Sequence, residues 1–542
     1  MEEDFIIKTK LGKIRGYKNV SQYSKQTYYS YCGVPYAKPP IEELRFQPPV
    51  PYGKWKGILD ARKERDDCIH YAIIYRDIIG SEDCLYLNIH LSEYPPPKEN
   101  LKSVIVHFHG GGYSFGSGNR DYYGSPDFII HKDFVYVNFN YRLHVLGFLN
   151  LDLPECSGNA GLKDAVLALQ WVKQNIQAFG GDPNNITLFG CSSSASAIHL
   201  LMMHPHHRNL FNKAIMSGSC ATNPTINYCE NHFHKATQLA KIMGCYETRP
   251  RKLLQFFRKQ NAENIIDSLN ILRKMELPTN RLTAQHNLFI PSIEKFPDGA
   301  ILAEYPINLW HTIDPIPVIY GVCNIDGMQA FAQGSPIQSL AFEFKDAVRR
   351  ILWAYKMDES LLQEVAAKIK AFYFPDGDIN VKKCREVCEF YQDTWQAQMY
   401  MSFLDVMHNK NPNNSLYIYE FWYEGSYNIA KRVAMRHLPC LMEGADHGDD
   451  YYYFVGLNQN LNYTPNDVVI IDYMSEFFSN FAKYGNPNSD KIKGVEWKPY
   501  TPEDPSYLKF NLELEVAEGR LNDKRIKFWE ELLNYIKSKC TN

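Results

Sequence analysis

The chain has 542 residues, of which 58 are Lys or Arg and 61 are Asp or Glu, so its formal net charge is −3. This small imbalance argues against a protein that binds nucleic acid or an anionic membrane surface through charge. Hydrophobic residues make up 45% of the chain and charged residues 22%, the balance of a globular protein with a large core.

The chain carries no sign of a membrane span, a secretion signal or a zinc ribbon. No apolar run approaches the roughly 20 residues that cross a bilayer. The first residues, MEEDFIIKTKLGKIRG, lack the basic and apolar regions of a secretion signal. We therefore expect a cytoplasmic protein, or a secreted one if a signal has been removed. Thirteen cysteines without a CxxC pair favour neither a zinc ribbon nor a dense disulfide framework, and we expect no metal and no cofactor.

Short apolar runs rich in β-branched and aromatic residues predict buried strands. In chain order these runs occupy residues 103–108, 134–139, 186–189, 317–320 and 416–420. Between them, GLKDAVLALQWVKQNIQAFGG has apolar residues at helical spacing and ends on a glycine pair, which predicts a helix. Alternating strands and helices favour an α/β fold whose large, mostly parallel sheet has helices on both faces. Without repeats or long linkers, residues 1–542 are expected to form a single domain.

A serine-rich stretch, LFGCSSSASA, follows the third of these strands. The strand is expected to end at Phe189, and a helix to begin at about Ser193. A nucleophilic serine at a strand-to-helix turn has small residues two positions before and after it, as in GxSxG. Only Ser192 has a glycine two residues before it, and position 194 is serine, so four of the five positions match. A cluster of helix-capping serines is the alternative interpretation of this stretch.

Three glycines follow the first predicted strand, in the run His109–Gly112. Glycines at this place allow backbone N–H groups to turn toward one point, as stabilisation of a tetrahedral oxyanion requires. A flexible turn is the alternative.

Two further side chains complete a hydrolytic set. Asp326 lies just beyond the strand at 317–320, and His447 stands among small and acidic residues in GADHGDD. Histidine can take the proton of a serine and return it to a leaving alcohol, while a carboxylate fixes the histidine tautomer. The chain order Ser192, Asp326, His447 is the order found in α/β-hydrolases.

Six stretches, taken together, resemble the type-B carboxylesterase/cholinesterase family of α/β-hydrolases, and its insect α-esterase branch more closely. They read SEDCLYLNIH, HGGGYSFGSG, NYRLHVLGFL, GNAGLKDAVLALQWV, FGGDPNNITLFGCSSS and GADHGDD. The resemblance runs from about residue 5 to about residue 530 and implies a serine carboxylesterase with an α/β-hydrolase fold.

Carried over position by position, the resemblance implies Ser192 as nucleophile, His447 as base and Asp326 as the acid where most of the family has glutamate. It also implies an oxyanion hole made by the backbone of Gly111, Gly112 and Ser193. The resemblance further pairs Cys68 with Cys84 in the family's first disulfide, whereas the partner expected for Cys245 is missing.

The elbow departs from the family at two positions. Where the family reads GESAG, this chain has Cys191 before the nucleophile and Ser194 in place of the last glycine. A strain of roughly 3 kcal/mol falling wholly on the transition state slows a reaction about a hundredfold. We therefore expect a slow esterase rather than an inactive one. Cys191 is the weaker nucleophile candidate, because the residue before the nucleophile normally points away from the pocket.

The expected substrates are small-molecule aliphatic or aryl carboxylic esters. Residues 68–84 contain no tryptophan of the kind that binds choline in the cholinesterases. Tyr113 and Phe115, after the glycine run, suggest an apolar pocket, with core packing as the alternative. The resemblance implies xenobiotic or lipid-ester metabolism and organophosphate inhibitors as further partners, in a monomer or homodimer. A non-catalytic esterase-like binding protein is the competing function.

Metal binding is a third and weaker interpretation. It rests on HPHH at 204–207 or on Cys384 with Cys388, and each of these lacks a matching second half.

Overall fold

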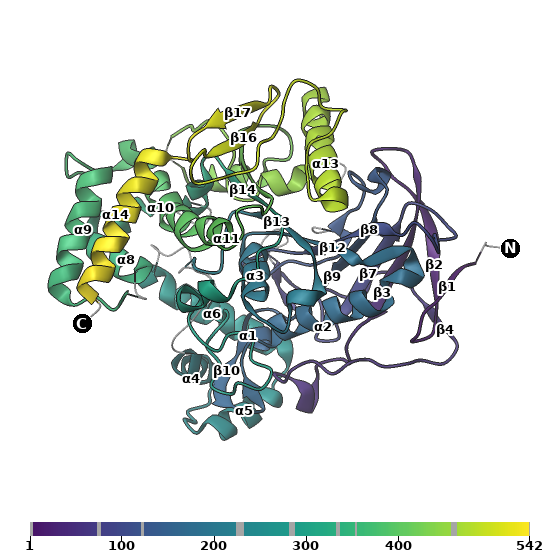
Figure 1. Cartoon of the computed structure of the whole chain (residues 1–542). Coiled ribbons are helices and arrows are strands. Elements are labelled where there is room, and N and C mark those ends of the chain that lie inside the picture. Colours follow the sequence, from purple (N-terminus) through teal and green to yellow (C-terminus); the bar gives the residue numbers. More distant parts are fainter. Residues whose placement is uncertain are drawn as a thin grey trace.

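We describe the protein from a computed structural model. The structure describes residues 4–72, 77–120, 124–223, 232–280, 288–331, 336–352, 355–438, 440–456 and 463–540. Within these ranges the dominant feature is a sheet of thirteen strands (Figure 1). The strands are β1 Phe5–Lys8, β2 Lys13–Val20, β3 Thr27–Pro35, β4 Ile58–Asp60, β7 Tyr86–Leu91, β8 Lys102–Phe108, β9 Val135–Phe139, β12 Gly181–Cys191, β13 Lys213–Ser217, β14 Val318–Cys323, β15 Leu416–Phe421, β16 Ser506–Phe510 and β17 Glu515–Glu518. Two small strand pairs stand apart from it: β5 His70–Ala72 with β6 Asp77–Ile79, and β10 Asn150–Leu153 with β11 Cys156–Ser157.

The sheet is parallel in its middle and antiparallel at its ends. Its strand order is β1-β2-β3-β7-β9-β8-β12-β13-β14-β15-β16-β17, with β4 beside β2. Every pair from β9 through β16 is parallel, while the pairs from β1 to β9 and the pair β16–β17 are antiparallel. The carboxyl ends of the parallel strands share one edge of the sheet, where reactive loops of open α/β sheets gather.

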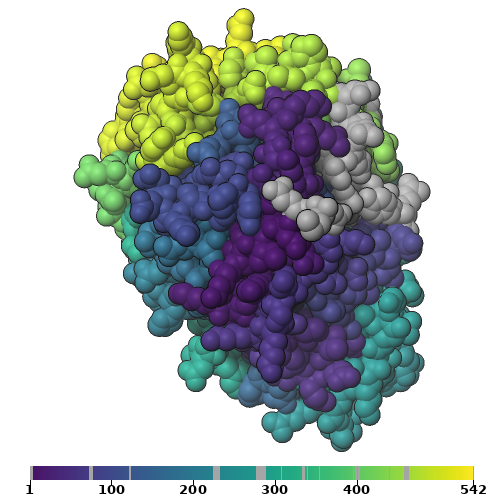
Figure 2. Space-filling model, turned by 90° about the vertical axis from the view of Figure 1, so that its right-hand side faces the viewer, coloured from purple at the N-terminus to yellow at the C-terminus, as the bar shows by residue number. Residues whose placement is uncertain are grey.

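Helices cover both faces of the sheet. They are α1 His144–Phe148, α2 Ala160–Asn175, α3 Ser193–Met203, α4 His232–Ile242, α5 Pro250–Arg258, α6 Ala262–Asn280, α7 Pro306–Leu309, α8 Ile337–Ile351, α9 Glu359–Tyr373, α10 Cys384–Met399, α11 Asp405–Lys410, α12 Ile429–Ala434, α13 Pro465–Tyr484 and α14 Asp523–Cys540. In Figure 1, α2 and α3 lie on one side of the central strands and α13 on the other. Figure 2 shows the N-terminal segment, in purple, spread along one face of the molecule.

Alternate residues of the central strands pack into two separate cores. In β8, Val104 and Val106 belong to the core that holds α2 and α3, whereas Ile105 belongs to the core that holds α13. In β12, Leu188 faces the first core and Phe189 the second. Successive side chains of a strand point to opposite faces, so a strand with cores on both sides is apolar at nearly every position. This explains why these strands appear in the sequence as continuous apolar runs.

The predicted mostly parallel sheet with helices on both faces is confirmed. The predicted runs correspond to β8, β9, β12, β14 and β15, although Phe134 and Pro317 lie just before their strands and β12 continues past Phe189 to Cys191. The predicted helix is α2, followed by the 3₁₀ helix Ile176–Phe179, and Gly180 ends it with φ 78°. The single domain over residues 1–542 stays a prediction.

Candidate active site

Ser192 lies at the turn between β12 and α3, with φ 63° and ψ −129°. Such a φ is uncommon outside glycine, so backbone strain is concentrated at this residue. A β-carbon at Gly190 would lie 2.8 Å from both Ser194 Oγ and Ile198 Cδ1, so the helix passes close over the end of the strand. The Ser194 hydroxyl donates a hydrogen bond to the carbonyl of Cys191 at 2.7 Å. The serine that replaces the family's glycine is therefore accommodated with its polar group satisfied.

Ser192, His447 and Asp326 lie together. Ser192 Oγ is 2.8 Å from Nε2 of His447, and Nδ1 of His447 is 3.0 Å from Oδ1 of Asp326. Asp326 begins the 3₁₀ helix Asp326–Phe331 just after β14, and His447 lies between α12 and α13. Asp326 is fully buried and His447 is 9% exposed. The imidazole thus joins a hydroxyl at the end of β12 to a carboxylate beyond the end of β14.

Gly218 makes room for the histidine ring. It follows β13 directly, has φ 71°, and donates its N–H to the carbonyl of Gly321 at 2.9 Å. A β-carbon at Gly218 would lie 2.7 Å from Cε1 of His447, so any larger residue would displace the imidazole. Sequence reasoning missed this residue, because a lone glycine after a short strand matches no motif.

The electrostatic surroundings of His447 favour its protonated form. Burial, the largest effect, opposes the imidazolium, but the charge and hydrogen bond of Asp326 and the charges of Asp450 and Asp449 outweigh it. The pKa of His447 is therefore raised above its ordinary value of about 6.5. A histidine in this setting takes up a proton readily and is stabilised while it holds it.

A second buried carboxylate lies behind the elbow. Asp450 accepts hydrogen bonds from the Ser217 hydroxyl at 2.5 Å and from the Tyr419 hydroxyl at 2.6 Å. Burial, followed by the charges of Asp450 and Asp326, raises the pKa of the Cys191 thiol well above its ordinary value. Cys191 is thus held as a neutral thiol, which disfavours it as a nucleophile. The acidic run after His447 was the only signal for Asp450 in the sequence.

Asp449 accepts hydrogen bonds that link the segment carrying His447 to α12. Its Oδ1 accepts the backbone N–H groups of Ala430, at 2.9 Å, and Lys431, at 3.3 Å, at the start of α12. Its Oδ2 accepts the N–H of Asp446 at 2.8 Å and the side-chain amide of Asn428 at 3.3 Å. One buried carboxylate therefore holds the residue before His447 against α12.

The glycine run after β8 lies against the elbow. A β-carbon at Gly110 would lie 2.6 Å from the carbonyl oxygen of Cys191. Gly111 has φ 111°, and a β-carbon there would lie 2.0 Å from the carbonyl oxygen of Phe115. Gly112 has φ 61°. Close approach and positive φ together require glycine here, so this loop has a defined shape.

The aromatic residues after the glycine run have different environments. Tyr113 is fully buried, and its ring centroid lies 5.1 Å from that of Phe148 in the core. Phe115 is partly exposed. For Tyr113, core packing is thus the structural role.

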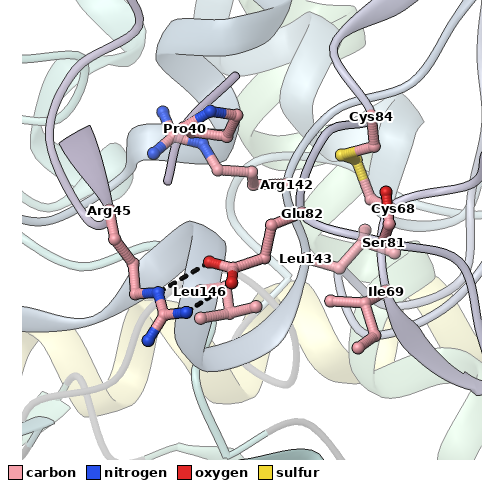
Figure 3. Close-up of a pocket in the computed structure, with 10 residues that line it drawn as sticks. All are labelled: Pro40, Arg45, Cys68, Ile69, Ser81, Glu82, Cys84, Arg142, Leu143 and Leu146. Carbon is pink, nitrogen blue, oxygen red and sulfur yellow. Dashed lines mark hydrogen bonds and ion pairs between the residues drawn. A yellow bond between two sulfur atoms is a disulfide. The ribbon is translucent and has the colours of Figure 1, made fainter. Parts of the chain in front are cut away.

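Cys68 and Cys84, the pair implied by the resemblance, are joined by a disulfide, whereas Cys245 is unpaired. A small pocket lies beside the disulfide (Figure 3). Its wall includes Arg45, whose guanidinium pairs with Glu82 through two hydrogen bonds. Ser192, Asp326 and His447 are not among the residues that line this pocket.

The histidines of HPHH pack on each other and on the chain. The rings of His204 and His207 stack with centroids 4.1 Å apart, and His204 Nε2 is 2.8 Å from the carbonyl of Ala300. In the described ranges, no group of three or more His, Cys, Asp or Glu side chains is arranged to hold a metal ion. Over the same residues, no helix combines the length and apolar character needed to cross a membrane.

Comparison with known proteins identifies the family. The model of the carboxylesterase family matches residues 3–529. Esterase E4 of Myzus persicae is 32% identical, over 86% of this chain and 84% of that protein. Venom carboxylesterase-6 of Apis mellifera is 30% identical, over 97% of this chain and 95% of that protein.

A solved structure agrees with this assignment over nearly the whole chain. The crystal structure of juvenile hormone esterase from Manduca sexta, with OTFP covalently attached, matches with a TM-score of 0.84 and 27% identity. The match covers 98% of this chain and all of that one. The chain therefore belongs to the carboxylesterase family of α/β-hydrolases, whose reaction is the hydrolysis of carboxylic esters.

Proposed function

We propose that Ser192 is the nucleophile of this esterase, that His447 is its general base and acid, and that Asp326 orients His447. The observation that carries this proposal is the continuous contact from Ser192 Oγ through the imidazole to Oδ1 of Asp326. The strained backbone at Ser192 supports it, because a nucleophile elbow holds its hydroxyl in such a conformation.

The reaction proceeds in two displacement steps. In the first, Ser192 Oγ attacks the ester carbonyl carbon while His447 Nε2 accepts the hydroxyl proton. His447 then returns that proton to the alkoxide oxygen, the alcohol leaves, and an acyl group remains on Ser192. In the second, a water molecule gives a proton to His447 and attacks the acyl carbon. The carboxylic acid leaves as Ser192 recovers its proton.

The oxyanion of each tetrahedral intermediate is held by the N–H groups of Gly111, Gly112 and Ser193. Ser193 is the first residue of α3, so its N–H has no acceptor within the helix. Gly110 fixes the glycine run against the elbow. The two sources of donors are therefore adjacent, as an oxyanion hole requires.

The substrates are uncharged aliphatic or aryl esters of xenobiotic or lipid origin. Residues 68–84 have no tryptophan to bind a quaternary ammonium group, and position 191 has a neutral thiol instead of a carboxylate. A dialkyl aryl phosphate triester would transfer its dialkyl phosphoryl group to Ser192 Oγ and release the aryl alcohol. Because water removes that phosphoryl group slowly, the protein would also sequester organophosphates.

Hydrolysis of 4-nitrophenyl butyrate by the wild type and Ser192→Ala tests the proposal, together with mass spectrometry after exposure to a dialkyl 4-nitrophenyl phosphate. We expect turnover to be lost in the variant and one phosphoryl adduct to be found on Ser192. Ser196→Ala is the matched control, because Ser196 lies one turn along α3 with its hydroxyl bonded to Ser219 and Cys220. A folded wild type with neither turnover nor adduct would contradict the proposal and favour the non-catalytic binding protein.

A further inference from the structure

Sulfur-containing side chains gather where α10 passes the chain just before the active-site histidine. Cys384 and Cys388 lie one turn apart at the start of α10, so their side chains share one face of the helix. Sγ of Cys388 lies 4.0 Å from Sδ of Met442. Cys440, two residues before Met442, thus runs alongside the same face near Cys384.

The Cys384 thiol donates a hydrogen bond to the carbonyl of Val381 at 2.8 Å and lies within hydrogen-bonding reach of the Cys440 thiol. Burial and then the hydrogen bond with Cys440 raise the pKa of Cys384 to about 12. Cys384 is 1% exposed, whereas Cys440 is partly exposed, and neither takes part in a disulfide. Cys384 with Cys440 and Cys388 with Met442 are thus two neighbouring sulfur pairs, one helical turn apart, between α10 and the segment before His447.

We propose that Cys384 and Cys440 are a modification site at which a second, reversible disulfide forms and joins α10 to the segment that leads to His447. Among the cysteines that the structure describes, Cys68 and Cys84 form the disulfide already present. The proposed Cys384–Cys440 bond would differ from the Cys68–Cys84 bond because it would join α10 to the segment that leads to His447.

The position of this site couples it to the catalytic loops. A β-carbon at Gly327 would lie 1.9 Å from the carbonyl oxygen of Cys388, so the residue after Asp326 rests directly on α10. The N–H of Ile325 donates to the carbonyl of Ala445 at 3.1 Å. A bond between α10 and residue 440 therefore joins two segments of chain that each adjoin the loops carrying Asp326 and His447.

The chemistry is thiol–disulfide exchange with a small disulfide such as oxidised glutathione. The accessible Cys440 thiol loses its proton, attacks one sulfur of the oxidant and releases one glutathione thiolate. Cys384 then loses its proton, attacks Sγ of Cys440 and releases the second glutathione thiolate. Two protein thiols are oxidised and one small disulfide is reduced to two thiols. The high pKa of Cys384 makes the second step faster at alkaline pH.

Peptide mapping of the native full-length protein tests this site. The protein is incubated with oxidised glutathione at about pH 8.5, alkylated, and digested without reduction. We expect the peptide of Cys384 to be linked to that of Cys440, and dithiothreitol to release the two. The exposed Cys540 is an internal control, because its mixed disulfide with glutathione shows that the oxidant acted.

The variants distinguish this pair from its neighbour. Cys388→Ser should keep the link, whereas Cys384→Ser and Cys440→Ser should abolish it. Free, alkylated Cys384 and Cys440 in a sample whose Cys540 is modified would overturn the proposal. So would a bond from Cys440 to Cys388.

Thermal unfolding gives a readout that does not depend on proteolysis. The new bond closes a long loop, so the oxidised wild type should unfold a few degrees above the reduced wild type. Cys440→Ser should show no such shift. An equal rise in the variant would assign the effect to another thiol and contradict the proposal.

Discussion

The three consecutive serines of the elbow have three different environments. Ser192 has the positive φ that presents its hydroxyl to His447. Ser193 begins α3 and is buried, and Ser194 bonds to the carbonyl of Cys191. At the scale of single residues, the positive φ of the elbow lies on the proposed nucleophile itself.

The unusual residues around the nucleophile are expected to limit its rate. The double change Cys191→Glu with Ser194→Gly, which restores the family pattern, should raise kcat/KM for 4-nitrophenyl butyrate. A gain of up to about a hundredfold corresponds to roughly 3 kcal/mol of transition-state free energy. The two single variants assign the gain to one position. An unchanged rate in the double variant would refute the view that these positions limit catalysis.

The raised pKa of His447 predicts the pH profile. The base must be neutral in the free enzyme, so log kcat/KM should fall as the pH decreases through a value above 6.5. Asp326→Asn removes the carboxylate's charge while burial remains, so this acidic limb should move to lower pH. The same change should reduce kcat by about 10³- to 10⁴-fold. Asp326→Glu keeps the charge that most of the family supplies from glutamate and should keep the limb in place. An acidic limb of the kcat/KM profile that is at the same pH in Asp326→Asn as in the wild type would contradict this account.

Motifs predict some of these residues and not others. Ser192, Asp326 and His447 are found from local patterns and chain order, because each stands in a recognisable loop. Gly218 and Asp450 contribute through contacts between distant segments: Gly218 lies beside the His447 ring, and Asp450 is bonded by Ser217. Apart from the acidic run after His447, nothing near them in the sequence marks such contacts.

At the scale of elements, the site is assembled by the ends of neighbouring parallel strands. β12 ends at the elbow, β8 ends at the glycine run, and β14 ends before Asp326. Since β8 and β14 flank β12 and β13 in the sheet, these loops lie on one edge. His447 is the exception, since its segment follows α12 and is placed by hydrogen bonds rather than by a strand end.

Asp449 is therefore a positioning residue for the His447 segment. Asp449→Ala leaves three backbone N–H groups without this acceptor and removes one of the two acceptors of the Asn428 amide, which should lower the free energy of unfolding by roughly 2–5 kcal/mol. We expect kcat to fall at temperatures where the variant is folded, and Asp449→Asn, which keeps one acceptor oxygen, to lose less. Urea unfolding and steady-state rates measure both effects.

The exposed Asp504 provides a control for Asp449. Asp504→Ala should change neither the urea midpoint nor kcat. A normal kcat in folded Asp449→Ala would mean that the carboxylate stabilises the protein without positioning His447.

Elements were predictable where burial on two faces made them continuously apolar. β8, β9 and β15 match their predicted runs closely. β12 begins five residues before its apolar run because Gly181 pairs with Lys102, and backbone pairing of this kind leaves no apolar pattern. The antiparallel N-terminal strands escaped prediction for a related reason. Strand β2, KIRGYKNV, has only two buried residues, Ile14 and Gly16, and three basic ones, so it contains no apolar run.

At the scale of the whole molecule, the modest net charge and the neutral thiol at position 191 favour uncharged ligands. The chain should hydrolyse 3,3-dimethylbutyl thiobutyrate faster than butyrylthiocholine, since the two have the same shape and differ only in charge. Comparison of their kcat/KM values with one thiol reagent measures the preference. A higher kcat/KM for butyrylthiocholine would require a cation site and would contradict the substrate class proposed above. Whether the enzyme is a monomer or a homodimer stays a prediction, which sedimentation velocity checks.

The two ends of the large sheet bear on aggregation. An unpaired strand edge can template pairing with another chain, and short or charged edge strands suppress this. β1 has four residues, and the Tyr94 hydroxyl donates to the carbonyl of Ile6 on it at 3.3 Å. At the other end β17 reads EVAE and exposes a glutamate at each terminus. Both edges are thus poor templates for a neighbouring copy, which protects a sheet of this width from growing into an intermolecular one.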